Sequence, residues 1–106
     1  CSFSQSKVTV YEDNFVSLKL TCKDDIGIQS RILYSGLIGP LTINSYYAKI
    51  DSVSKPTCSA NVCTWTIKIE GKHRKSDPIS LSLVAGAVRD TKGLTNDTIT
   101  SYITIK

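Results

Sequence analysis

The sequence predicts an all-β protein in which two sheets pack as a sandwich. β-branched and aromatic residues dominate the chain, apolar and polar residues alternate with the two-residue period of half-buried strands, and turn-forming residues bound these runs. With 106 residues, of which 41% are hydrophobic, the chain is long enough for one domain with a core and too short for two. We therefore expect residues 1–106 to form a single domain.

Four runs in the first half of the chain predict strands. They are residues 7–11, 16–22, 28–34 and 41–50. In the first run Val8 and Val10 alternate with polar residues, and the second run alternates in the same way. Because the polar turn residues Glu12, Asp13 and Asn14 lie between these two runs, we expect the runs to form a hairpin.

Three further runs predict strands in the second half. They are residues 63–69, 79–88 and 98–105, and the polar residues 71–78 predict a loop between the first two. In the first run Cys63, Trp65, Ile67 and Ile69 share one face. Trp65 is the only tryptophan in the chain, and its place in this apolar series predicts a core residue rather than a ligand platform.

Two stretches of the chain combine strands and turns in a recurrent order. In VSLKLTCKDDIGIQSRILY, Asp25, Gly27 and Ile28 form a D-x-G-I turn between two strands. In ISLSLVAGAVRDTKGLTNDTITSYITIK, an apolar strand ends in Ala-Gly, and an Asp-x-x-Gly turn leads to a final strand. The residues of this second pattern are Ala85, Gly86, Asp90 and Gly93. In these features, which cover about half of its length, the chain resembles the bacterial-type (Big-like) immunoglobulin-like domains repeated in surface proteins and adhesins.

This resemblance implies an immunoglobulin-like β-sandwich of about seven antiparallel strands in two sheets. If one sheet has the strand order A-B-E-D, Cys1 begins strand A, Cys22 ends B, Cys58 ends D and Cys63 begins E. In that arrangement a Cys1–Cys58 bond would have to span about 14 Å, which is too far for a disulfide. We expect a Cys1–Cys22 bond, which ties the N terminus to its neighbour, and a Cys58–Cys63 bond, which closes a short loop.

Two other states of the cysteines stay open at this point. The first is a four-thiolate zinc site, which usually contains C-x2-C pairs, whereas the spacings here are C-x20-C and C-x4-C. The second is a set of free buried thiols. Disulfide bonds would indicate a secreted or cell-surface protein. The triplet Asn96-Asp97-Thr98 agrees with that location, because Asn96 is then a candidate glycosylation site, although a turn before the last strand explains the same residues.

The sequence offers little that could support catalysis. The single histidine, His73, lies in a basic run without an apolar pocket sequence around it, and the acidic residues are scattered, so we expect no enzyme and no cofactor. The formal charge of +4 is mild and spread along the chain, which argues against nucleic-acid binding. No apolar run is long enough for insertion into a membrane. We expect no metal site. Weak calcium candidates are Asp24, Asp25, Asp90 and Asp97, which are explained more simply as turn residues.

These observations predict a non-enzymatic extracellular module of a longer surface protein, acting in adhesion or as a structural spacer. Its expected partners are the neighbouring domains of the same chain and a surface protein or glycan. One alternative is a lectin-like module with the candidate stacking residues Tyr34, Tyr46 and Tyr47. Another is a receptor-binding domain that uses the basic loop residues Lys72, Arg74 and Lys75.

Overall fold

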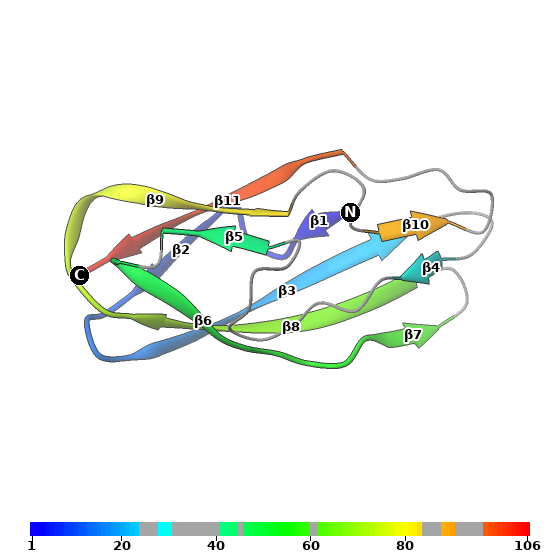
Figure 1. The fold of residues 1–106 in the computed structure, drawn as a ribbon, viewed down its shortest axis with the longest axis horizontal. Coiled ribbons are helices and arrows are strands. Elements are labelled where there is room, and N and C mark those ends of the chain that lie inside the picture. The colour runs from blue at the N-terminus through cyan, green and yellow to red at the C-terminus, as the bar shows by residue number, and fades with distance from the viewer. Residues whose placement is uncertain (24–27, 31–40, 45, 60–61, 84–87, 91–96) are drawn as a thin grey trace.

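The computed structural model describes residues 1–23, 28–30, 41–44, 46–59, 62–83, 88–90 and 97–106, and within these ranges the fold is all-β (Figure 1). The strands are β1 (Ser2–Phe3), β2 (Lys7–Val10), β3 (Phe15–Lys23), β4 (Ile28–Ser30), β5 (Leu41–Ile43), β6 (Ala48–Val53), β7 (Thr57–Ser59), β8 (Val62–Gly71), β9 (Lys75–Leu83), β10 (Val88–Asp90) and β11 (Ile99–Ile105). In these ranges we find no helix able to cross a lipid bilayer.

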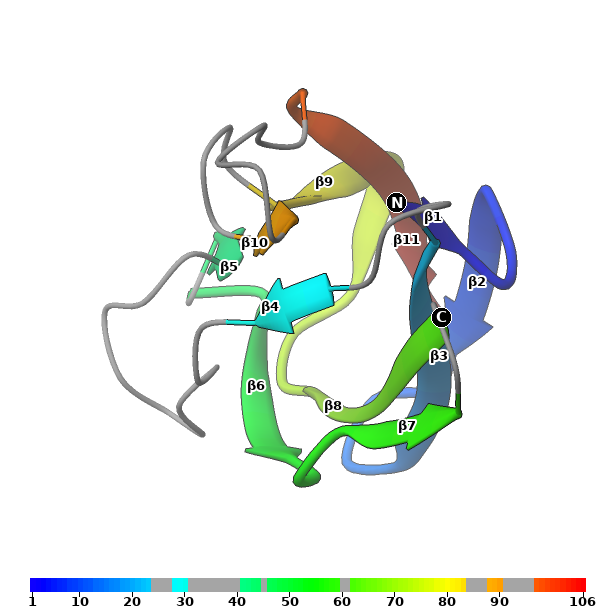
Figure 2. The same ribbon diagram turned by 90° about the vertical axis from the view of Figure 1, so that its right-hand side faces the viewer.

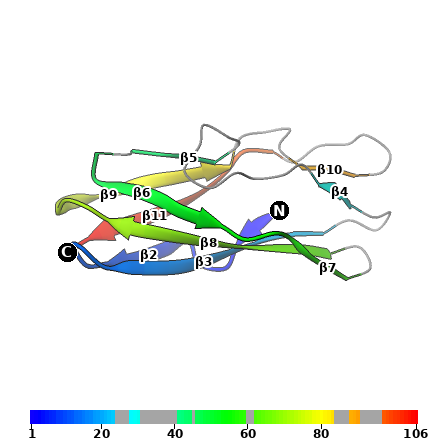
Figure 3. The same cartoon turned by 60° about the horizontal axis from the view of Figure 1, so that its bottom comes forward.

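The strands form two main sheets and a short two-stranded ribbon. The first sheet has the order β1-β3-β8-β6, with β7 also paired to β8, and Figure 3 shows β3, β8 and β6 side by side. The second sheet has the order β2-β11-β9-β5, and β10 pairs with β4 in the ribbon. Figure 2, which looks along the long axis, shows β7 and β8 at the bottom and β9 and β11 at the top.

Side chains from both main sheets fill one hydrophobic core, as a sandwich requires. The first sheet contributes Leu18, Leu20, Cys22, Ala48, Ile50, Cys63, Trp65, Ile67 and Ile69, and the second contributes Val8, Val10, Leu41, Ile79, Leu81, Leu83, Ile103 and Ile105. Trp65 is fully buried, so its predicted core position is confirmed. Its indole Nε1 is buried and finds no hydrogen-bond partner among the described residues.

The prediction that residues 7–11 and 16–22 form a hairpin is wrong. β1 takes the place beside β3, with Ser2 opposite Thr21, whereas β2 pairs in parallel with β11 in the other sheet. The chain crosses between the sheets near Gln5, whose carbonyl oxygen accepts a hydrogen bond from the buried Ser101 hydroxyl at 2.8 Å. β1 provides hydrogen-bond partners for main-chain groups at the edge of β3. β2 is therefore free to pair with the C-terminal strand β11.

Two other predicted elements also differ from the structure, whose described residues form eleven strands where about seven were expected. The predicted strand 41–50 is divided into β5 and β6, which belong to different sheets. The division follows from a turn in which Asn44 Oδ1 accepts the Tyr46 N–H at 3.1 Å. The predicted loop 71–78 is shorter than expected, because β8 extends to Gly71 and β9 begins at Lys75. Residues 31–34 and 84–87 of two predicted strands lie outside the described residues.

Candidate functional site

The four cysteines form two disulfide bonds, Cys1–Cys22 and Cys58–Cys63, as expected. The strand register places Cys22 of β3 opposite Cys63 of β8 and Cys63 opposite Cys58 of β7, and Cys1, which directly precedes β1, is bonded to Cys22 at one end of this row. All four sulfur atoms are therefore bonded, and none remains as a thiolate that could bind zinc. Two disulfide bonds are compatible with an extracellular location.

A second cluster of distinctive residues lies at the other end of the molecule, at the left of Figure 1, where the C terminus, the β2–β3 turn and the β8–β9 loop come together. We call it the basic–aromatic end. Its members are Tyr11, Glu12, Tyr46, Tyr47, Lys72, His73, Arg74, Lys75 and Lys106.

Backbone hydrogen bonds hold the segments of the basic–aromatic end together. The carbonyl oxygen of Tyr47 accepts the N–H groups of Lys72 at 2.8 Å and His73 at 3.1 Å. The N–H of Glu12 donates to the carbonyl oxygen of Lys106 at 2.7 Å, which ties the β2–β3 turn to the C-terminal residue. Since these bonds join main-chain atoms, the side chains of the same residues remain available for other contacts.

The β2–β3 turn depends on the positive φ of Asp13 and on the absence of a side chain at Gly71. Asp13 has a φ of 65°, the left-handed region that Asp and Asn tolerate better than most residues. Gly71 packs against the same turn, and a Cβ atom at this position would lie 2.8 Å from the carbonyl oxygen of Tyr11. The close approach of β8 to the turn therefore depends on a residue without a side chain.

Tyr46 and Tyr47 from one candidate set and Lys75 from the other meet in one aromatic cluster with His73. The Tyr46 ring stacks on the His73 ring with centroids 4.7 Å apart and planes at 22°, and it contacts Tyr47 edge-on at 4.9 Å. The Nζ of Lys75 lies 4.8 Å from the centre of the Tyr47 ring. Tyr46 is 64% exposed, so the stacked pair presents an aromatic platform to solvent. Tyr34, the third candidate stacking residue, lies outside the described residues.

A hollow of about 550 Å³ is lined by Tyr11, Glu12, Arg74 and Lys106, and Arg74 directly follows His73 of the platform. The main-chain N–H of Arg74 donates to Glu12 Oε2 at 3.2 Å. The sequence did not indicate Tyr11 or Lys106 as site residues. They lie together because β2 and β11 are parallel with Val10 opposite Ile105, so the residue that follows each strand reaches the same end.

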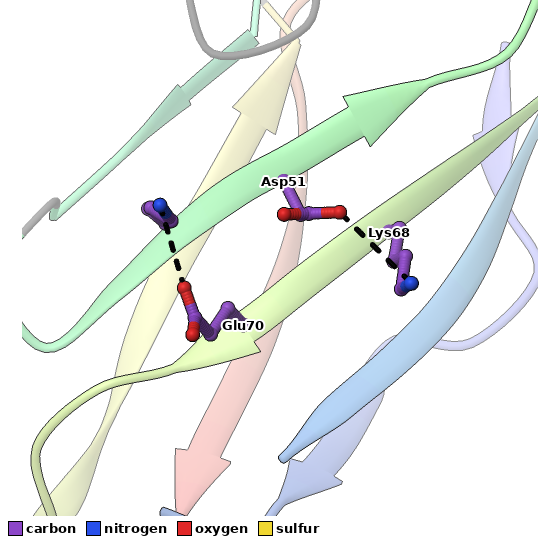
Figure 4. Close-up of polar contacts among 4 residues, drawn as sticks. Asp51, Lys68 and Glu70 are labelled. Carbon is purple, nitrogen blue, oxygen red and sulfur yellow. Dashed lines mark ion pairs between the residues drawn. The ribbon is translucent and has the colours of Figure 1, made fainter. Parts of the chain in front are cut away.

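The cationic side chains of the basic–aromatic end differ in their ion pairing from those on the outer face of the first sheet. There, Lys49 pairs with Glu70 at 3.5 Å and Lys68 approaches Asp51 at 4.0 Å (Figure 4). In the part of the chain that the structure describes, the side chain of Arg74 forms no ion pair, and neither does that of Lys72 or Lys106.

The calcium and glycosylation candidates do not form a described site. Asp24, Asp25 and Asn96 lie outside the described residues. Asp90 is the last residue of β10, and Asp97 is exposed just before β11. Within the described ranges no three histidine, cysteine or acidic residues gather as metal ligands would.

Comparison of the chain with protein-family models, curated proteins and solved structures finds no match. The chemistry of the basic–aromatic end is therefore the basis for a functional proposal.

Proposed function

We propose that the chain is an immunoglobulin-like module of a secreted or cell-surface protein, with neighbouring domains in the same chain, and that it acts without catalysis in adhesion. The strand order supports this assignment. The order β1-β3-β8-β6 corresponds to strands A-B-E-D of an immunoglobulin-like domain, and β9 and β11 correspond to strands F and G of the facing sheet.

The resemblance to bacterial surface domains gains support from one pairing between its two motifs. Ile28, from the D-x-G-I turn, lies opposite Asp90, from the Asp-x-x-Gly turn, in the β4–β10 ribbon. The two disulfide bonds support a secreted or surface location, since such bonds persist in oxidising compartments.

The observation that carries the adhesive role is the exposed aromatic platform of Tyr46 and His73 beside unpaired cations. Tyrosine and arginine are enriched among the residues that dominate binding energy at interfaces. A structural spacer has no need for such a surface at its end.

Carbohydrate binding is the second candidate, and the exposed Tyr46 ring favours it. The C–H groups of a sugar ring can pack on an aromatic face, while its hydroxyl groups stay hydrated. Tyr46 is 64% exposed, which leaves room for such a contact.

The experiment is retention of the oxidised protein on a panel of immobilised glycans and extracellular-matrix proteins. We expect Tyr46→Ala to weaken retention about 10-fold or more, as loss of a binding hot spot does. Tyr102→Ala is the matched control, because Tyr102 is also exposed, at 48%, but projects from β11 outside the basic–aromatic end. If the unmodified protein binds no member of the panel, the adhesive role is contradicted and the role of structural spacer is favoured. Equal losses in the two variants would show that Tyr46 is not part of the binding surface.

A further inference from the structure

We infer that the basic–aromatic end recognises an acidic polysaccharide, with a sulfate or carboxylate group held in the hollow beside Tyr11, Arg74 and Lys106. This inference rests on the proposed adhesive function and adds the chemical class of the ligand. Three properties of the site carry it, namely its unpaired cations, the residues that line the hollow and the aromatic platform.

The cations at this end outnumber the acids that could neutralise them. Lys72, Arg74 and Lys106 are exposed and form no ion pair within the described ranges. Glu12, which lines the same hollow, accepts the main-chain N–H of Arg74, and no ion pair joins it to the guanidinium. The site therefore has positive charge available for an anion in solution.

The residues that line the hollow suit an anion. It has a volume of about 550 Å³, and both Arg74 and Lys106 line it. A guanidinium group offers paired N–H donors that match the oxygen atoms of a carboxylate or sulfate, and a lysine adds a flexible positive charge. Tyr11, which is 60% exposed, gives one side of the hollow an aromatic surface.

The platform distinguishes a polysaccharide from other polyanions. His73 directly precedes Arg74, which lines the hollow, so one saccharide chain could place a sugar ring on the exposed Tyr46 ring and an acidic group in the hollow. The charge is too local for nucleic acid, whose binding depends on many phosphate contacts. The exposed large apolar side chains of the described residues are all aromatic, which suits packing against sugar rings.

The test measures binding of the oxidised protein to heparin, as a sulfated probe, and to polygalacturonate, as a carboxylate probe, in about 0.15 M NaCl. Neutral dextran, polyglutamate and single-stranded DNA are the comparison ligands. The site variant is Arg74→Gln/Lys106→Gln, which keeps long side chains while removing two positive charges. The matched control is Lys23→Gln/Lys55→Gln, which makes the same change in net charge at two exposed lysines outside the basic–aromatic end.

We expect heparin or polygalacturonate to bind, the site variant to weaken that binding at least 10-fold, and the control to weaken it less than 3-fold. Tyr46→Ala should also weaken it, which gives a second variant that leaves the charge unchanged. About 0.5 M NaCl should weaken binding as well, because salt screens exposed charges.

Three results would overturn the inference. Equal losses in the site and control variants would mean that only net charge matters. Binding of polyglutamate or DNA as tight as that of the acidic polysaccharides would mean that the site does not recognise sugars. Adhesion that depends on Tyr46 but is not inhibited by either acidic polysaccharide would refute this ligand class while leaving the proposed function intact; loss of both activities would refute both.

Discussion

The two disulfide bonds close loops of different length, and this difference predicts unequal contributions to stability. The sequence separations are 21 residues for Cys1–Cys22 and 5 residues for Cys58–Cys63. In the loop-closure model the first bond stabilises the fold by about 3.3 kcal/mol and the second by about 2.1 kcal/mol at 25 °C, because the longer loop loses more entropy in the unfolded chain.

The comparison is between Cys1→Ala/Cys22→Ala and Cys58→Ala/Cys63→Ala. Each variant loses one exposed and one buried cysteine, since Cys22 is 1% and Cys63 2% exposed, so the loss of buried sulfur contacts is matched. We expect the first variant to be less stable than the second by about 1 kcal/mol.

The assay is urea unfolding of the oxidised proteins, followed by the fluorescence of Trp65, the only tryptophan, which is fully buried in the fold. If the Cys58/Cys63 variant loses as much free energy of unfolding as the Cys1/Cys22 variant, or more, loop length does not determine the effect of these bonds.

Two further substitutions test the packing around the chain crossing and the turn. Gly71→Ala should lower the free energy of unfolding by about 1–3 kcal/mol, because the new Cβ would lie 2.8 Å from the main-chain oxygen of Tyr11, which cannot move without the turn. Ser101→Ala should lower it by about 1–2 kcal/mol, because it removes the buried donor to Gln5. Both are measured by urea unfolding with exposed Ser80→Ala as the control, and changes as small as the control's would contradict them.

The alternation of apolar and polar residues was enough to predict the core. Leu18, Leu20, Ile67 and Ile69 occupy the buried face because each strand has one face against the other sheet. The same pattern does not say which strands are neighbours. The pairing of β2 with β11 depends on β1, whose length of two residues is too short to produce a periodic signal.

The candidate site could be predicted only as separate pieces. The tyrosines Tyr46 and Tyr47 and the basic loop at Lys72–Lys75 are visible in the sequence, but their contact depends on the turn that separates β5 from β6. The hollow was missed because Tyr11 and Lys106 meet only through the parallel pairing of β2 and β11. A two-residue period determines which face a residue occupies and carries no information about which strand ends coincide.

The Cys1–Cys22 bond also determines how the protein would respond to mechanical tension. A pulling force applied to residues 1 and 106 passes from Cys1 directly to Cys22, so the intervening residues, including β2, cannot be stretched while the bond is intact. The Cys58–Cys63 bond removes its own loop from the loaded path in the same way. With separations of 21 and 5 residues, the bonds shorten the fully stretched chain by roughly 90 Å, at about 3.5 Å per residue. Reduction of the bonds would therefore increase the length to which a pulling force can extend this chain.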